Sequence, residues 1–319
     1  MNHFKILNYL IMNGLVLSIG ATHLRAQELA TRNQAHVHTQ DTQNIDDTKW
    51  FSKEIMREKT FDGLRSVEPE DVKQFEMLLI ATIAEIEKLE NKITVEELQN
   101  RWAKLDWQLT RSPSGNIFVV REHLDHQHGR GVYAFRCGHR SRIILQAPHR
   151  FNDLMTGSIA IRLFQEQAVS AIALNTIHRS EIDLSHTNLH FINSFTSAVI
   201  KARHDIAILQ IHGFTNDGKT GAAKSANVIV SDTTNFPGRS ARKSAAELKA
   251  TFGADHTRLF PVDIRTLGGT TNSQAKLAHS LGCPDFLHIE LNRTFRNKLN
   301  ADASVRATFF ASMTAGISK

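Results

Sequence analysis

Residues 143–153 read Ile-Ile-Leu-Gln-Ala-Pro-His-Arg-Phe-Asn-Asp, an apolar run that leads into a histidine, His149, and a carboxylate, Asp153. A short apolar run that ends at a proline is typical of a buried strand. His149 and Asp153 lie four positions apart on a segment that we expect to turn from this strand into a helix. The stretch therefore predicts a buried strand with a polar site at its carboxyl end.

Strands and helices alternate after this stretch, which predicts an α/β fold: a mixed, largely parallel sheet flanked by helices. Ahead of it, short β-type runs at 107–110, 116–121 and 132–137 predict an antiparallel lead-in. We expect further strands at 171–174, 206–211, 227–230 and 286–291, and helices at 156–167, 187–203, 241–252, 273–281 and from 303 onward.

A smaller helical region precedes the sheet. Between Glu70 and Lys92 apolar residues recur every three or four positions, which predicts an amphipathic helix. Thr94 with Glu97 three positions later predicts a capping box at the start of a second helix. We expect the apolar stripe to pack on the main domain and not to form a coiled coil, since it lasts too few heptads. The boundaries are 49–106 for this helical region and 107–319 for the α/β domain.

The N-terminal residues resemble a secretory signal peptide. Lys5 is followed by a largely apolar run over 6–21, and small residues at Ala21 and Ala26 offer two cleavage points, of which Ala26 is preferred. The alternative is a retained membrane anchor, but the run is shorter than the roughly 20 apolar residues that span a bilayer. We therefore expect a signal peptide at 1–26, a flexible polar leader at 27–48, and an exported protein, periplasmic or secreted, without a stable membrane span.

Net charge bears on the class of substrate, and the two cysteines bear on a possible disulfide. The formal charge of +6 falls to +4 when the two cations Lys5 and Arg25 leave with the signal, which favours a small anionic or peptide substrate over nucleic acid. Cys137 and Cys283 form one disulfide or remain two free thiols, and the sequence leaves both possibilities open.

Polar side chains follow three of the predicted strands. His149 and Asp153 follow the first, His212 follows the run at 206–211, and Glu290 follows the run at 286–289. Ligands of open α/β sheets bind beyond the carboxyl ends of the strands. A catalytic zinc takes three protein ligands, commonly two histidines and one carboxylate. These residues therefore predict Zn²⁺ held by His149, Asp153 and His212, with Glu290 as a carboxylate that is not a ligand.

The order of these motifs resembles that of N-formylglutamate amidohydrolases and, more distantly, zinc N-acetylmuramoyl-L-alanine amidases and zinc carboxypeptidases. The resemblance covers residues 142–298 and implies Glu290 as general base and acid. Asp153 stands where many relatives have Glu, and Arg150 and Phe151 stand where N-formylglutamate amidohydrolases have small residues, which leaves the substrate open. The matching motifs are Ala-Pro-His149 with Asp153, then Arg179 and Asp183, then Ile-His212-Gly, then His-Ile-Glu290-Leu-Asn-Arg293.

The predicted function is hydrolysis of an amide bond in an N-acyl amino acid or a cell-wall peptide, in which zinc makes its bound water more acidic and Glu290 takes the proton. Arg179 or Arg293 either stabilises the oxyanion or holds a substrate carboxylate. The alternative function is a non-catalytic envelope binding module on the same fold.

Four further residues are expected around the ligands, where their side chains orient them. Alternatively, His178 or His186 replaces one of the three metal ligands. Asp183 could instead be the N-cap of the helix expected from residue 187. The four are Asn175, His178, Asp183 and His186.

Overall fold

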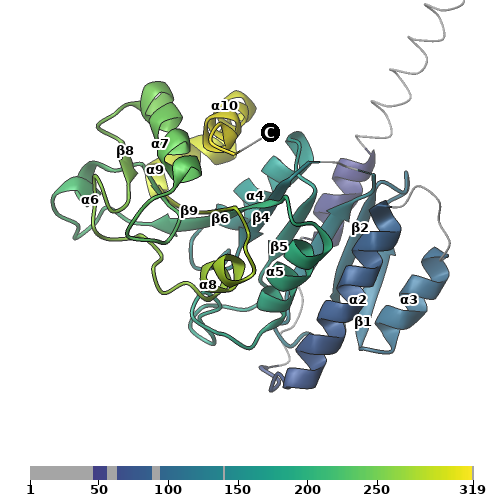
Figure 1. Ribbon diagram of the computed structural model, residues 1–319. Coiled ribbons are helices and arrows are strands. Elements are labelled where there is room, and N and C mark those ends of the chain that lie inside the picture. The colour runs from purple at the N-terminus through teal and green to yellow at the C-terminus, as the bar shows by residue number, and fades with distance from the viewer. Residues whose placement is uncertain (1–45, 56–62, 88–93, 139–140, 318–319) are drawn as a thin grey trace, which may run out of the picture.

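Four neighbouring parallel strands form the centre of the sheet (Figure 1). The computed structural model describes residues 46–55, 63–87, 94–138 and 141–317. In it, strands β5 (Ala171–Leu174), β4 (Ile143–Ala147), β6 (Ala207–Phe214) and β9 (Asp285–Asn292) lie side by side in that order. Because they run in one direction, their carboxyl ends share one edge of the sheet, which we call the carboxyl edge.

Further strands extend this centre on both sides. Within the described residues the sheet has nine strands in the order β1-β2-β3-β5-β4-β6-β9-β7-β8. The expected mixed α/β sheet is confirmed, with parallel pairing in the centre and between β7 and β8, and antiparallel pairing elsewhere. The added strands are β1 (Trp107–Arg111), β2 (Ile117–Glu122), β3 (Val132–Arg136), β7 (Val228–Ser231) and β8 (Thr257–Leu259).

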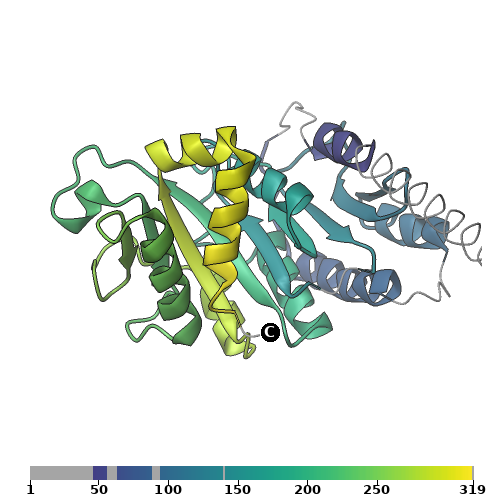
Figure 2. The ribbon, with the colours of Figure 1, turned by 90° about the horizontal axis from the view of Figure 1, so that it is seen from above.

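Helices cover both faces of the sheet, as the two views in Figures 1 and 2 show. No helix of the described part of the chain is long and apolar enough to cross a membrane. One face packs against α2 (Pro69–Glu87), α3 (Val95–Ala103), α5 (Phe191–Ala202) and α8 (Ser273–Ser280). The other face packs against the helix at 46–55, α4 (Thr156–Glu166), α7 (Arg239–Phe252), α9 (Arg293–Ala301) and α10 (Ala303–Thr314), and a short helix α6 (Ala222–Ser225) lies beside β7.

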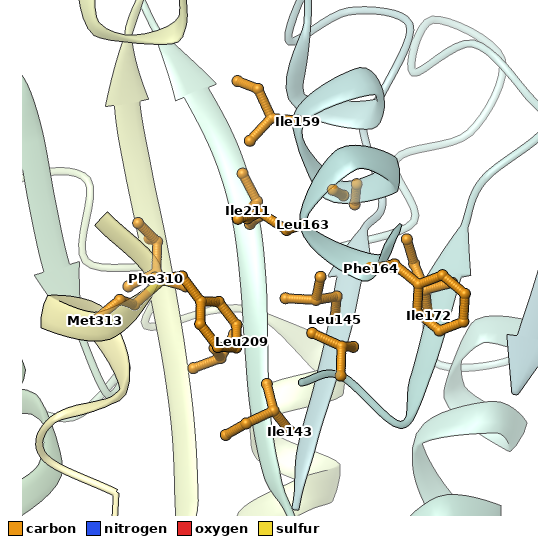
Figure 3. Close-up of a cluster of buried hydrophobic side chains, with 14 of the residues drawn as sticks. Ile143, Leu145, Ile159, Leu163, Phe164, Ile172, Leu209, Ile211, Phe310 and Met313 are labelled. Carbon is orange, nitrogen blue, oxygen red and sulfur yellow. The ribbon is translucent and has the colours of Figure 1, made fainter. Parts of the chain in front are cut away.

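Alternate side chains of the central strands build the second of these faces. Leu145, Leu209 and Ile211 point from β4 and β6 toward Leu163 of α4 and Phe310 of α10 (Figure 3). All are buried, and each such side chain stabilises the fold by about 1.5–3 kcal/mol. The intervening residues nearer the carboxyl ends of the same strands include three buried polar ones, Gln146, Gln210 and His212, of which Gln146 contacts α5 and Gln210 contacts α8. One face of the central strands is thus an ordinary core, and the other carries buried polar groups.

The helical region packs on the sheet through aromatic side chains, as expected. Phe75 of α2 lies 5.3 Å from Trp102 of α3, 4.7 Å from Trp107 of β1 and 5.2 Å from Tyr133 of β3, measured between ring centroids. Trp102 Nε1 donates a hydrogen bond to Thr82 Oγ1 at 3.0 Å. The apolar stripe of α2 is therefore used in the core.

Half of the predicted capping box is present. Thr94 Oγ1 accepts a hydrogen bond from Glu97 N at 3.1 Å and so caps α3. The carboxylate of Glu97 pairs with Arg101 at 2.6 Å and does not reach back to the cap.

Cys137 and Cys283 are free thiols, so the possible disulfide between them is not formed. Cys137 follows β3 and Cys283 precedes β9, and three strands lie between β3 and β9. Strands are spaced about 4.8 Å apart, so the two positions lie far beyond the roughly 4.4–6.8 Å between Cα atoms that a disulfide spans.

Several element boundaries differ from the prediction. The three-residue strand β8 and the helix α9 were not expected, and the strands carrying His212 and Glu290 continue past these residues. Helix α5 begins at Phe191 and not near 187, with His190 as its N-cap. Asp183 is therefore not a helix cap. The predicted signal peptide and residues 27–45 of the predicted leader lie outside the described residues.

His190 joins α5 to the loop before β3. Its Nδ1 accepts a hydrogen bond from Ile192 N at 3.4 Å, and its Nε2 lies 3.2 Å from the carbonyl oxygen of Gly129. Burial lowers the pKa of His190 to about 4, although the Gly129 carbonyl opposes that shift. The ring is therefore neutral in the folded protein at neutral pH.

This buried ring makes stability dependent on pH. As pH falls from 6.5 toward 4, the unfolded chain takes up a proton at His190 that the folded chain does not, so the free energy of unfolding falls. His190→Asn keeps a capping acceptor without a titrating ring. We expect urea unfolding at pH 7 and pH 4 to show a loss of stability about 1–3 kcal/mol smaller in this variant. An equal loss in both proteins would contradict the assignment.

Candidate metal centre

Three adjacent parallel strands bring the predicted site residues to the carboxyl edge. His149 comes two residues after β4, and His212 and Glu290 lie on β6 and β9. The register pairs His212 directly with Glu290, and Gln146 with Gln210. Side chains paired in this way project from the same face of a sheet. The carboxyl edge therefore places a carboxylate beside a histidine.

A tight turn brings Asp153 back over His149. The carbonyl oxygen of His149 accepts hydrogen bonds from Asn152 N at 3.0 Å and Asp153 N at 2.8 Å. The Asp153 carboxylate then meets β6, where its Oδ2 accepts a hydrogen bond from Gly213 N at 3.0 Å. This geometry explains the spacing of four residues between the histidine and the carboxylate.

His149, Asp153 and His212 form the one group of three or more His, Cys, Asp or Glu residues, within the described part of the chain, whose ligand atoms lie close enough to share a metal ion. Asp153 Oδ2 is 3.7 Å from His149 Nδ1 and 3.5 Å from His212 Nδ1. A tetrahedral zinc with bonds of about 2.0–2.1 Å holds neighbouring ligand atoms about 3.3–3.4 Å apart. The observed separations are close to that spacing.

The hydrogen bonding of His149 leaves one ring nitrogen for a metal. Its Nε2 lies 2.8 Å from Asp183 Oδ1. Partial burial would raise the pKa of Asp183, but His149 and Arg179 outweigh that effect and hold it below its usual value. Asp183 is therefore an ionised acceptor, and His149 Nε2 carries the hydrogen. No partner within the described residues reaches His149 Nδ1, although it is buried. Such an orphaned nitrogen suits a cation between it and Asp153.

Burial and neighbouring groups shift the pKa values of the other two ligands, His212 and Asp153. It lowers the pKa of His212 to about 4, and the charge of His288 adds to that shift, so the ring is neutral at pH 7. Burial would raise the pKa of Asp153, but its interactions with the nearby His149 and His212 rings hold it well below its usual range. The site thus combines two imidazoles with one carboxylate anion.

Glu290 is buried beside this group but is not part of it. Its Oε1 lies 3.2 Å from Nε2 of His288, whose ring centroid is 4.3 Å from that of His212. Its Oε2 has no hydrogen-bond partner among the described residues. One carboxylate oxygen is therefore held by His288, while the other is a buried acceptor that no described residue uses.

Arg296 is a buried cation of this site that the sequence analysis missed. The residue is 5% exposed, and its Nη1 donates a hydrogen bond to the carbonyl oxygen of Leu291 at 3.1 Å. Burial lowers the pKa of Arg296, and the charges of Asp153 and Glu290 oppose that shift. A Cβ atom at Gly213 would stand 1.4 Å from Nη1. The glycine after His212 thus makes room for the guanidinium, which is the signal that the sequence contained.

Two other cations, Arg179 and Arg293, were assigned to catalysis in the sequence analysis. Arg179 contacts Asp183 Oδ2 through Nε at 2.9 Å and Nη2 at 2.7 Å, so its guanidinium fork already binds a carboxylate. Arg293 is exposed at the first position of α9, directly after β9. Neither is in direct contact with the three residues of the metal group.

Of the four residues expected around the ligands, Asp183 alone contacts a ligand side chain. His186 contacts Asp183 through Nδ1 at 3.0 Å and so acts through it. Asn175 Oδ1 accepts a hydrogen bond from Arg150 N and holds the loop after β4. His178 is exposed and contacts Ser180 at 2.8 Å, away from the group.

Comparison with known proteins gives distant structural likenesses only. No family model and no curated protein sequence matches the chain. An N-formylglutamate amidohydrolase from Ralstonia eutropha is 9% identical with a TM-score of 0.41, covering 59% of this chain and 98% of that chain. A bacteriophage poly-gamma-glutamate hydrolase is 12% identical with a TM-score of 0.37, covering 56% and 82%. A tripeptide-bound cell shape determinant protein from Helicobacter pylori is 14% identical with a TM-score of 0.38, covering 56% and 52%. At these TM-scores the likenesses assign neither a family nor an activity to this chain.

The contact between Gly213 and Arg296 can be tested with an added methyl group. Gly213→Ala should force the guanidinium from its place and lower the free energy of unfolding by about 1–3 kcal/mol. Removing the long side chain as well, in Gly213→Ala/Arg296→Ala, should cost less than the sum of the two single changes, because the clash disappears. Urea unfolding of all four proteins measures this difference. Strictly additive changes would show that the two residues do not meet.

Proposed function

We propose that the chain is a zinc-dependent hydrolase that cleaves an amide bond. The observation that carries the proposal is the group of His149, Asp153 and His212, with an unpartnered, buried Nδ1 on His149 and ligand atoms at the spacing of a tetrahedral metal. Two histidines and one carboxylate with an open fourth position are typical of catalytic zinc sites and not of structural ones. The buried Glu290 beside His212 supplies the acid–base group that such hydrolysis requires.

The three ligands, Glu290 and His288 have separate roles in the proposed hydrolysis. A zinc ion held by the three ligands would act as a Lewis acid on the scissile carbonyl and on water. Glu290 Oε2 takes a proton from the attacking water, whose oxygen adds to the carbonyl carbon. When the carbon–nitrogen bond breaks, Glu290 returns the proton to the leaving nitrogen. His288 holds Oε1, which leaves Oε2 without a partner among the described residues.

The substrate class that we propose is an N-acyl amino acid or a peptide from the cell wall. Support comes from the order of motifs in the sequence and from the net positive charge of the chain. Arg293 at the start of α9 is an exposed cation at the carboxyl edge, placed to meet an anionic substrate group. The export predicted from residues 1–26 would put this activity outside the cytoplasm.

Replacing one carboxylate oxygen of Glu290 by an amide nitrogen separates the effect on metal binding from the effect on catalysis. Glu290→Gln should retain about one zinc per chain, because Glu290 is not a ligand, and should lose roughly 10²–10⁴-fold in kcat/KM. The measurements are metal analysis and hydrolysis of N-acyl amino acids and cell-wall peptides. Glu247→Gln, on the exposed side of α7, is the matched control and should keep full activity.

Two results would count against the proposal. Full activity in Glu290→Gln would remove Glu290 from the mechanism. A purified chain that holds no zinc and hydrolyses none of these amides, with stability unaffected by chelators, would favour a non-catalytic binding module.

A further inference from the structure

The segment Gly268–Asn272, which precedes α8, contacts neighbours of both histidines of the metal group. A Cβ atom at Gly269 would stand 2.9 Å from the ring of His288. Thr271 Oγ1 lies 2.8 Å from Nε2 of His186, the residue that pairs with Asp183. Asn272 Nδ2 lies 2.6 Å from Gln210 Oε1. In sequence these residues resemble an ordinary glycine-rich loop, but in the structure they reach several neighbours of the ligands.

The orientation of the Asn272 amide is fixed by the backbone. Its Oδ1 accepts a hydrogen bond from Ala275 N at 2.9 Å as the N-cap of α8. A backbone N–H only donates, so the atom that faces it is the oxygen. The other end of the amide must then be the nitrogen, and it donates to Gln210. Asn272 is 2% exposed, so water does not compete for this bond.

The fixed amide determines what Gln210 offers to the metal ligand. Because Gln210 Oε1 accepts from Asn272, the same oxygen must accept from Nε2 of His212, 2.8 Å away. A neutral imidazole carries one hydrogen, and here it is on Nε2. The lone pair is therefore on Nδ1, the nitrogen that faces Asp153 at 3.5 Å. This is the tautomer that a metal at the proposed site requires.

Two further glutamines favour the same orientation of the Gln210 amide. Gln210 Nε2 donates to Gln146 Oε1 at 3.0 Å and to Gln274 Oε1 at 3.3 Å. Gln274 Nε2 in turn donates to the carbonyl oxygen of Leu184 at 2.8 Å, which fixes its orientation. The three glutamines are fully buried. Reversing any one amide would leave buried donors facing donors, at a cost of about 1–3 kcal/mol for each unsatisfied group.

We propose that Asn272 is a positioning residue of the metal centre, which acts through Gln210 to hold His212 in the Nε2–H tautomer and so keeps Nδ1 free for the metal. The inference rests on the proposed function for the identity of the site, but the tautomer exists without any metal. Asn272 contacts neither metal ligand nor substrate, so its effect is transmitted by hydrogen bonds alone.

The test replaces the donor and retains the helix cap. In Asn272→Asp an oxygen still accepts from Ala275 N, but the new carboxylate presents an acceptor to Gln210. The Gln210 amide should then reverse, present its nitrogen to His212 and move the imidazole hydrogen to Nδ1. Asn272→Ser also keeps a capping oxygen and removes the donor without adding charge, which provides a second variant if the carboxylate prevents folding. Asn100→Asp, at an exposed position of α3, is the matched control.

Two measurements are made on each protein. Long-range ¹H–¹⁵N correlation of the imidazoles in the metal-free protein identifies the tautomer of His212, and titration with Zn²⁺ gives its Kd. We expect Nε2–H in the wild type and the control. In Asn272→Asp that tautomer should be lost and the zinc affinity should be about 10–100-fold weaker. In Asn272→Ser, where the glutamines still orient the Gln210 amide, both losses should be partial.

Two outcomes would overturn the inference: Nδ1–H at His212 in the wild type, or Asn272 variants that keep both Nε2–H and wild-type zinc affinity. A wild-type chain that shows the Nε2–H tautomer but binds no zinc would instead overturn the proposed function. The two failures are therefore distinguishable.

Discussion

The parallel pairing of β6 with β9 is the constraint on which the rest of the site depends. Its register puts His212 beside Glu290 and Gln210 beside His288, so four polar side chains stand on one face of two neighbouring strands. The opposite face of the same strands is apolar and packs against α4 and α10. A shift of one residue in either strand would exchange these faces and bury the carboxylate among leucines and isoleucines. The hydrophobic core therefore determines the register of β6 and β9, and with it which polar side chains meet at the site.

Burying the glutamine amides of this face is tolerated because each of them has hydrogen-bond partners. The amides of Gln146, Gln210 and Gln274 donate and accept in a single connected network, and Asn272 joins that network to the backbone at the start of α8. A network of this kind is costly to disturb, since any unpaired member bears the full penalty of desolvation. The atoms left unpaired are instructive, because His149 Nδ1 and Glu290 Oε2 are among them and both belong to the proposed reaction.

The sequence predicted those parts of the molecule that depend on local pattern. The stripe of α2 and the central strands follow from apolar periodicity, and His149, Asp153, His212 and Glu290 follow from their positions after strands. Contacts between segments that lie far apart in the chain could not be predicted from local sequence pattern. Arg296 lies on a helix whose polar sequence gave no sign of burial, and its only trace was the glycine after His212. Asn272 resembled a loop residue, and the separation of the two cysteines depends on a strand order that no local pattern records.

The burial of Arg296 has a consequence for the electrostatic field at the carboxyl edge. The formal charges of Asp153, Glu290 and Arg296 are −1, −1 and +1, which sum to −1, so these three side chains give the metal-free centre a net negative charge when its histidines are the neutral imidazoles that bind a metal. A divalent cation would reverse that sign and leave the loaded centre net positive. Long-range steering acts on the sign of such a field and weakens with salt. An anionic substrate would accordingly be drawn toward the loaded form and repelled by the empty one, so that metal occupancy would govern the rate of encounter as well as the chemistry.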